Sequence, residues 1–319
     1  MELKDIKNLN QRIYELDTVI SRNAKMMFIA TLIFCSLEKE FWDIKKLTSL
    51  VNFNTSKSPV DDLILLAKNN IENIQIIDKT KEAVFTSLTI ISGVNTKLNS
   101  DRVKLQQFVT TFITDYLPLL KNDKTLFLET LYMEVDKKAK GSNEGITLTP
   151  DFAAQLMVDL AELDYKKDVV ADLASGTGLF SLLSYSVMLN DMNDDYKNKK
   201  ITDSEYKIYS ERLYNSIIAN DSDSKMVTLC LANFIIKNLN TEFIQNEDVF
   251  EMQKSTFKYK DAKGNDLNIN PSKGILNPPY EDSYKPVDLL LKMIELIKDN
   301  KSTSEKVVVI VPPQKFGQK

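Results

Sequence analysis

The stretch VVADLASGTGLFSLLSY, residues 169–185, decides the fold of the second half of the chain. An apolar, β-branched run ends in Asp172, a short loop follows, and an apolar helical pattern begins after Gly178. Strand, loop and helix in this order open an α/β unit. Two of the chain's eight glycines, Gly176 and Gly178, lie in this loop. Because glycine lets a ligand approach the backbone, we expect a ligand loop, with a tight turn that binds nothing as the alternative.

The loop matches neither of two common nucleotide-binding patterns. No Gly-Lys-Ser/Thr follows, so it is not a P-loop. Ser181 stands where the dinucleotide fingerprint G-x-G-x-x-G has its third glycine.

Four further β-branched runs follow this first strand, with helical patterns between them. They are SIIAN (216–220), EFIQN (242–246), KGILN (273–277) and KVVVIV (306–311). Apolar strands that alternate with helices predict a parallel sheet covered on both faces, the doubly wound α/β fold. Ligands of such sheets bind beyond the carboxyl ends of the strands, so we expect the chemistry there.

The first 140 residues are mainly helical by pattern. Apolar residues recur at helical spacing over 60–74 and 105–116, and residues 83–94 fit helix or strand equally. The apolar run Met26–Leu37 is too short to span a membrane, which needs ~20 residues, and predicts a buried helix. A hydrophilic, glycine-containing passage at 136–145 marks a boundary. We predict an all-α domain at 1–142 and a catalytic domain at 143–319.

Composition excludes several classes of site. The chain has no histidine and two cysteines, so histidine-dependent nucleophiles, imidazole zinc sites and four-cysteine metal sites are ruled out, and we expect no metal. No signal peptide is recognisable after Met1, which favours a cytoplasmic protein without a membrane role. Only four of the 41 basic residues are arginine and the net charge is −4. Since arginine does most reading of guanine, we do not expect independent recognition of a DNA sequence.

The segment GILNPPYEDSY, residues 274–284, is the second informative stretch. A strand runs directly into Asn277-Pro278-Pro279-Tyr280, where the two prolines fix φ and donate no N–H. An amine could be held by two acceptors, the side-chain oxygen of Asn277 and the carbonyl oxygen of Pro278. The ring of Tyr280 offers a face on which a planar substrate can stack.

The pattern Asp-x-x-x-Gly-x-Gly after a first strand resembles the S-adenosylmethionine loop of class I methyltransferases. The resemblance implies S-adenosylmethionine as cofactor, with Asp221 after the second strand at the ribose and Asp248 after the third at the adenine. The loop residues that it assigns to the cofactor are Asp172, Ala174, Gly176 and Gly178.

Asn-Pro-Pro-Tyr after the fourth strand resembles the signature of methyltransferases that act on planar nitrogen, above all the adenine-N6 DNA methyltransferases. This resemblance implies direct transfer of a methyl group to an amine, without a metal or a covalent intermediate. It gives the catalytic roles to Asn277, Pro278 and Tyr280.

The segment GITLTPDFAAQLMVDLAEL, residues 145–163, precedes the first strand. We expect an amphipathic helix with Thr149 as N-cap, Pro150 as its first residue and one apolar stripe of Phe152, Leu156, Leu160 and Leu163. The Thr-Pro entry resembles adenine-N6 DNA methyltransferases whose cofactor motifs come first, where Thr-Pro lies by the methionine end of the cofactor. With the helical N-terminal part, the likeness is to the modification subunit of type I restriction-modification systems. It implies DNA with a flipped adenine and a specificity subunit as partners, and leaves a restriction subunit open.

The sequence also departs from that family. Leu148, Leu173, Ser175 and Thr177 replace its usual residues, and a polar, partly helical insertion fills about 190–215. The last predicted strand is followed by few residues where the family's fold adds two strands, so we expect a truncated C-terminus or completion by another chain. The alternatives are a protein-glutamine or RNA N-methyltransferase, and a non-catalytic assembly module that retains the fold.

Overall fold

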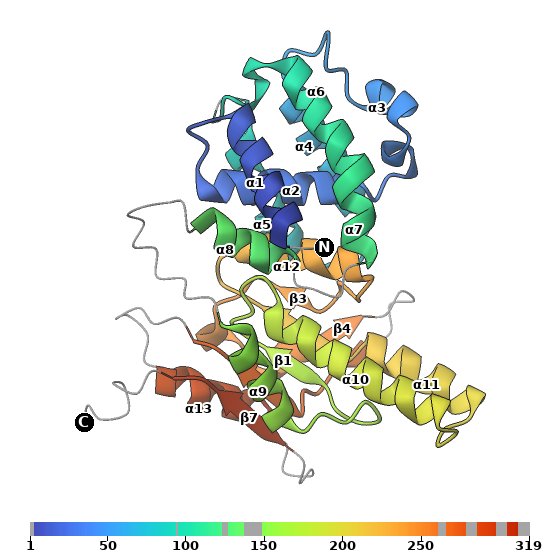
Figure 1. The fold of residues 1–319 in the computed structure, drawn as a ribbon. Coiled ribbons are helices and arrows are strands. Elements are labelled where there is room, and N and C mark those ends of the chain that lie inside the picture. Colours follow the sequence, from blue (N-terminus) through green and yellow to red (C-terminus); the bar gives the residue numbers. More distant parts are fainter. Residues whose placement is uncertain are drawn as a thin grey trace. The chain divides into compact units, whose positions relative to one another are not determined.

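The computed structural model describes residues 3–93, 95–122, 127–136, 149–260, 266–278, 286–297 and 305–311. Its contacts divide the chain into two compact units (Figure 1). The first contains Met1–Ser142 and Ser224–Thr241, and the second contains Asn143–Asp223 and Glu242–Lys319. The inclusion of 224–241 in the first unit is not part of the sequence prediction. The assignment of 143–319 as a catalytic domain stays a prediction.

The described part of the first unit is helical. Its helices are α1 (Leu3–Leu16), α2 (Arg22–Cys35), α3 (Ile44–Leu50), α4 (Pro59–Glu72), α5 (Asp78–Leu88), α6 (Arg102–Thr111), α7 (Leu117–Asn122), α8 (Phe127–Asp136) and α12 (Ser224–Lys237), with a π-helical turn, η4 (Phe112–Tyr116), joining α6 to α7. The undecided stretch 83–94 begins as the second half of α5 and continues in a 3-10 turn, Thr89–Ile91.

Helix α2 is the core of this unit, as its apolar sequence predicts. Every residue from Ala24 to Cys35 is buried, because helices α4, α5, α8 and α12 pack around it. The Ser21 side chain caps α2 by accepting the Ala24 N–H at 3.2 Å. Helix α12 joins the unit through its contacts with α2 and α5, and Ser87 on α5 bonds Ser224 at 3.0 Å.

The second unit is built on a parallel sheet. The described strands are β1 (Val170–Asp172), β2 (Ile217–Asn220), β3 (Ile244–Gln245), β6 (Lys273–Leu276) and β7 (Lys306–Val309), in the order β3-β2-β1-β6-β7. Each lies within one of the five predicted runs, and all neighbouring pairs are parallel. The strand order reverses next to β1, so the crevice at its carboxyl end is where a doubly wound sheet binds its ligand.

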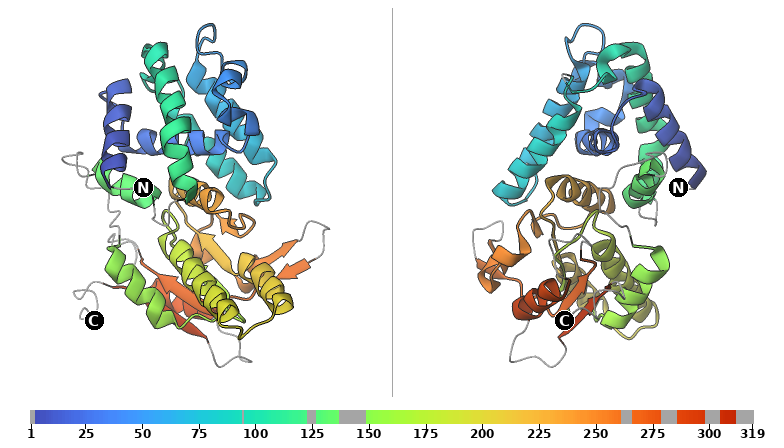
Figure 2. Two further views of the ribbon diagram at one scale, coloured as in Figure 1. Left: turned by 45° about the vertical axis from the view of Figure 1, so that its right-hand side comes forward. Right: turned by 90° about the vertical axis from the view of Figure 1, so that its left-hand side faces the viewer.

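Helices cover both faces of this sheet, which confirms the predicted fold class. Helices α9 (Asp151–Ala161) and α10 (Leu179–Lys197) lie on one face, and α13 (Pro286–Ile297) lies on the other (Figure 2, right). The insertion near 190–215 is the end of α10 together with α11 (Asp203–Tyr214), which packs beside α10. A short antiparallel ribbon, β4 (Lys258–Lys260) and β5 (Asp266–Asn268), precedes β6 and was not predicted.

Two predictions about helix α9 are wrong. Its N-cap is Pro150, not Thr149, and no side chain bonds the first turn. Phe152, Leu156 and Leu160 are 78%, 56% and 53% exposed, so this apolar stripe is not the face that packs on the sheet. The buried face carries the smaller residues of the helix together with Met157 and Val158. A close approach of helix to sheet favours small residues, which periodicity alone does not reveal.

None of the described helices combines the length and the apolar character that a membrane crossing requires.

Candidate active site

The glycine loop lies between β1 and α10, at the carboxyl end of the sheet. Gly176 has φ +53° and Gly178 has φ +92°, a left-handed backbone that other residues adopt only with strain. The Ser175 N–H donates to the carbonyl of Asn220, the last residue of β2, at 2.9 Å. A Cβ placed on Gly176 would meet no atom within 4 Å. The loop is therefore held against β2 while its glycine borders open space.

Asp221 directly follows β2 and joins this loop. Its Oδ2 accepts the Gly176 N–H at 2.9 Å, and its Oδ1 accepts the Asp223 N–H at 2.9 Å. Burial raises the pKa of Asp221 to about 6, with repulsion from Asp223 adding to the rise and the two backbone hydrogen bonds opposing it. The structure thus brings together two of the predicted cofactor residues, Gly176 and Asp221.

Asp172 ends β1 and is completely buried. Its Oδ2 accepts from the Ser181 hydroxyl at 3.3 Å, whereas its Oδ1 is buried without a hydrogen-bond partner. Burial raises the pKa of Asp172 to about 8, and the charge of Asp221 raises it further, against the Ser181 hydrogen bond. A buried polar atom without a partner costs free energy, so a bound donor or cation at Oδ1 would be favourable.

Asn220, which the sequence reading missed, fastens the strand ends together. Its Nδ2 donates to the carbonyls of Leu173 and Glu247, both at 3.1 Å, and its Oδ1 accepts the Glu247 N–H at 3.0 Å. The amide thereby links the ends of β1, β2 and β3. An amide in the last position of an apolar strand was the available signal, because a buried polar side chain needs partners.

Asp248 is at the same edge but apart from these contacts. It is exposed and caps a 3-10 turn, Val249–Glu251, by accepting the Phe250 N–H at 2.9 Å. Among the described residues, the preceding Glu247 ties it to the site through Asn220. Its role at the cofactor stays a prediction.

Asn277 and Pro278 follow β6, the other neighbour of β1. Gly274 lies opposite Ala171 in parallel register, so the chain leaves both strands at the same edge, at Ala174 and at Asn277. Asn277 is half-buried, and its Nδ2 donates to the hydroxyl of the buried Thr149 at 2.6 Å. The structure therefore joins the Thr-Pro and Asn-Pro segments, 128 residues apart. Tyr280 lies outside the described residues.

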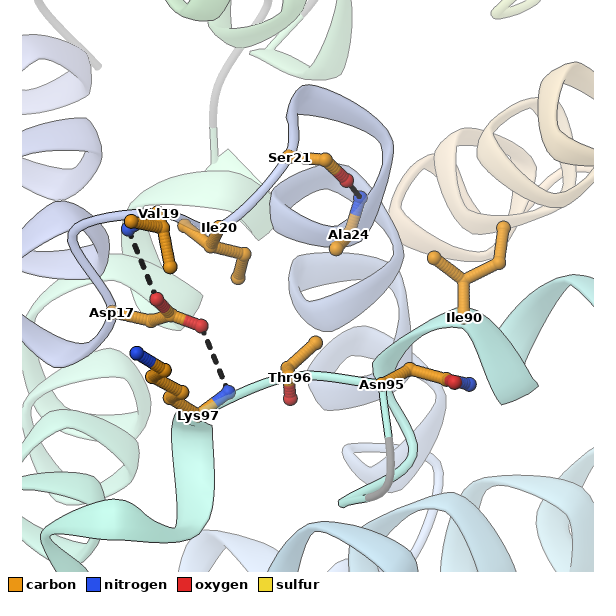
Figure 3. Close-up of a pocket in the computed structure, with 9 residues that line it drawn as sticks. All are labelled: Asp17, Val19, Ile20, Ser21, Ala24, Ile90, Asn95, Thr96 and Lys97. Atoms are coloured by element: carbon orange, nitrogen blue, oxygen red, sulfur yellow. Dashed lines mark hydrogen bonds between the residues drawn. The ribbon is translucent and has the colours of Figure 1, made fainter.

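A hollow in the helical unit has a volume of about 550 Å³ (Figure 3). Asp17 is the only carboxylate among the residues that line it. Its side chain accepts hydrogen bonds from the backbone N–H groups of Val19 and Lys97 at 3.0 and 2.9 Å. Both oxygens are thus used to shape the surrounding loops. The lining contains none of the predicted site residues.

Comparison with known proteins shows the family of the chain. The N-6 DNA Methylase family matches residues 129–315, more than half of the sequence. The chain belongs to this family. The match contains β1, β2, β3, β6 and β7 together with the Asn277-Pro278 segment.

Relatives of this N-6 DNA methylase family member come from restriction-modification systems. The type II restriction enzyme and methyltransferase RM.BcgI of Heyndrickxia coagulans is 27% identical over 188 residues, which are 58% of this chain and 26% of that protein. The chain thus spans about a quarter of the length of the curated relative that it matches.

Two solved structures share the fold. The type I restriction-modification methyltransferase subunit from Streptococcus thermophilus has a TM-score of 0.52 at 14% identity, covering 97% of this chain and 74% of that one. A modification subunit of a putative type I restriction enzyme from Vibrio vulnificus YJ016 has a TM-score of 0.54 at 16% identity, covering 96% and 70%. These two similarities confirm the predicted α/β fold, and the family match over residues 129–315 confirms the recognised adenine-N6 DNA methylase family.

Proposed function

We propose that the chain is the modification subunit of a restriction-modification system and transfers a methyl group from S-adenosylmethionine to the N6 amine of adenine in DNA. The observation that carries the proposal is the hydrogen bond from Gly176 N–H to Asp221, with Asn277 at the same edge of the sheet. Family membership supports the methyltransferase chemistry.

The residues present fit S-adenosylmethionine. The open space beside Gly176 has room for a ligand at the backbone. Asp221 offers a carboxylate to the ribose hydroxyls, and the partnerless Oδ1 of Asp172 suits a positively charged or N–H group. Ala174 and Gly178 belong to the loop. The family resemblance assigns Thr149 and Pro150 to the methionine end of the cofactor and Asp248 to its adenine. The cofactor supplies an electrophilic methyl group on a sulfonium.

The chain's own residues would position the amine. The side-chain oxygen of Asn277 and the carbonyl oxygen of Pro278 accept its two N–H hydrogens, and Tyr280 stacks on the base. Two acceptors on one amine favour the geometry in which the nitrogen lone pair is exposed. Catalysis by positioning and electrostatics needs no histidine, in agreement with the composition.

The target adenine would have to leave the duplex to reach this edge. With four arginines and a net charge of −4, the chain has little capacity of its own for reading bases. We therefore assign sequence choice to a specificity subunit, with a restriction subunit as a further partner of the assembly.

Two variants with crossed effects test the function. Asp221→Ala removes a charged hydrogen-bond acceptor and should weaken S-adenosylmethionine binding by roughly 10–100-fold in calorimetry. Asn277→Ala should bind the cofactor within about twofold of wild type but abolish transfer of labelled methyl to DNA, with the methylated base identified by mass spectrometry.

Asp159→Ala is the matched control, because this exposed acid on α9 bonds only its own helix at Gln155 among the described contacts. Asp159→Ala should change neither the affinity for S-adenosylmethionine nor the transfer of methyl to DNA. Unaltered affinity of Asp221→Ala, or turnover by Asn277→Ala, would contradict the assigned roles.

A further inference from the structure

Asn246 directly follows β3 and fastens the turn that carries Asp221. Its Nδ2 donates to two consecutive backbone carbonyls, that of Asp221 at 2.8 Å and that of Ser222 at 3.1 Å. The NH2 group of an asparagine has two donors, so one side chain can hold both carbonyls. Because the two carbonyls belong to neighbouring peptide groups, the amide restricts how this short stretch of backbone can rotate.

The other polar groups of Asp221 are also held. Its backbone N–H donates to the Gln245 carbonyl at 3.3 Å, which continues the pairing of β2 with β3 by one residue. Its carboxylate accepts the N–H groups of Gly176 and Asp223, each at 2.9 Å. With its carbonyl bonded to Asn246, every polar group of Asp221 has a hydrogen-bond partner, and the direction of the carboxylate is set before a ligand binds.

Asn220 and Asn246 hold different parts of the same edge of the sheet. The side chain of Asn220 bonds Leu173 and Glu247 and so joins the ends of three strands. The described side-chain contacts of Asn246 are both with the Asp221–Ser222 stretch. Asn246 therefore acts on the orientation of Asp221. A binding group that is already held in place loses less freedom when the ligand arrives.

We propose that Asn246 is a positioning residue for the cofactor: its amide holds the backbone of Asp221 so that the carboxylate is directed at the ribose hydroxyls. The inference rests on the proposed function. Each oxygen of a carboxylate can accept two hydrogen bonds, so Asp221 can keep Gly176 and Asp223 while it accepts from a ribose. Asn246 acts through Asp221 and needs no contact with the cofactor.

A double-mutant cycle in the full chain tests this indirect role. Asn246→Ala should bind S-adenosylmethionine about fivefold more weakly than wild type in calorimetry, a smaller loss than that of Asp221→Ala, because the acceptor remains and only its orientation is released. In the Asp221→Ala background the same change should cost less than about twofold, because the carboxylate through which Asn246 acts is gone. Wild-type affinity of Asn246→Ala, or equal factors in the two backgrounds, would overturn the proposal.

Asn70→Ala is the matched control. Asn70 is also a half-buried asparagine whose Nδ2 donates to two consecutive carbonyls, those of Phe34 and Cys35 at 3.0 and 3.3 Å. It belongs to the helical unit. Asn70→Ala should lower the melting temperature, as Asn246→Ala does, and should leave the affinity for S-adenosylmethionine unaltered. An equal loss of affinity in the two variants would show general destabilisation and refute a positioning role.

Amide hydrogen exchange without cofactor separates this proposal from the proposed function. The N–H groups of Gly176 and Asp223 donate to the carboxylate of Asp221, so release of that residue should speed their exchange. We expect exchange about fivefold faster in Asn246→Ala and unchanged in Asn70→Ala, followed by nuclear magnetic resonance. Unchanged exchange at both amides in Asn246→Ala refutes the anchor. Faster exchange in a chain whose wild type does not bind S-adenosylmethionine refutes the proposed function instead.

Discussion

Each end of the parallel sheet has a buried carboxyl group, and the two groups differ in how many of their oxygens have hydrogen-bond partners. At the amino end, Asp168 accepts from the Ser272 hydroxyl at 2.8 Å and from the Asp164 N–H at 2.9 Å, and pairs with Lys273 at 3.7 Å. Asp168 and Lys273 are 1% and 4% exposed. At the carboxyl end, Asp172 is equally buried but keeps one oxygen without a hydrogen-bond partner.

This difference in hydrogen bonding distinguishes a carboxylate with a structural role from one that is a candidate for binding a ligand. A buried charge with a cation and two further donors is satisfied by the fold itself. Asp172 ends the strand that leads into the loop of Gly176, and we propose that its partnerless oxygen meets a bound ligand. The two acids are four residues apart, so local composition does not distinguish them.

Removal of Asp168 should have the largest effect on stability. Asp168→Ala leaves Lys273 buried without its counter-charge, which costs roughly 3–5 kcal/mol. Urea unfolding should show this loss. The double variant Asp168→Leu with Lys273→Met removes both charges and should recover much of it, since a well-packed apolar pair is often neutral. Equal loss in the single and double variants would mean that the ion pair is not the cause.

The pH dependence of stability should reveal Asp172. Its folded pKa is raised to about 8 from the model-peptide value of 3.8, so the folded state holds a proton that the unfolded state releases. The stability that this proton contributes is complete below about pH 4 and is lost as the pH rises through 8, by up to about 1.4 kcal/mol per unit.

Asp172→Asn should flatten that slope. Without cofactor, the variant should unfold at a similar temperature to wild type near pH 5 and at a higher temperature near pH 9. Asp221, whose pKa is raised to about 6, adds a slope of the same sign at lower pH in both proteins. Asp159→Asn, an exposed acid of the same unit, should follow wild type. Parallel curves for Asp172→Asn and wild type would argue against a proton held at this position.

Two glycine substitutions should give the smallest and most selective effects. A Cβ on Gly274 would lie 2.7 Å from Ile297 Cδ1 and 2.9 Å from Met293 Cγ, so Gly274→Ala should destabilise by roughly 1–3 kcal/mol and spare the cofactor. Gly176→Ala strains a left-handed residue by about 1–2 kcal/mol but enters open space.

Calorimetry with S-adenosylmethionine distinguishes these two glycines. The added methyl of Gly176→Ala should weaken cofactor binding beyond what its stability loss explains, whereas Gly274→Ala should bind as wild type. Equal affinities for S-adenosylmethionine in the two variants would mean that the open space at Gly176 is not part of the cofactor site.

Short runs of β-branched and apolar residues predicted the strands, because a strand inside a parallel sheet is covered on both faces and is apolar throughout. Each described strand of the sheet falls within a run of β-branched residues, and the glycine loop and Asp221 follow them at the expected edge. The ribbon β4–β5 was missed because its strands have only three residues each and are mostly polar in sequence, which gives no apolar run or alternation to detect.

The errors at α9 have a different origin. Thr149 before Pro150 has the residue types of a capped helix start, yet its hydroxyl bonds Asn277, a partner 128 residues away. Likewise, Phe152, Leu156 and Leu160 form a regular apolar stripe, but the sheet accepts the face with smaller side chains. The local sequence pattern predicts that a helix forms. It does not show which face of that helix packs against the sheet.

The sequence by itself determined which runs form strands, where the glycine loop lies and which family the chain belongs to, because each depends on residue types at short spacing. The tertiary structure decided which buried acid is satisfied, which amide fastens the strand ends and what Thr149 holds. Those outcomes depend on atoms brought within about 3 Å across long separations, and hydrogen bonding at that range is set by the packed fold.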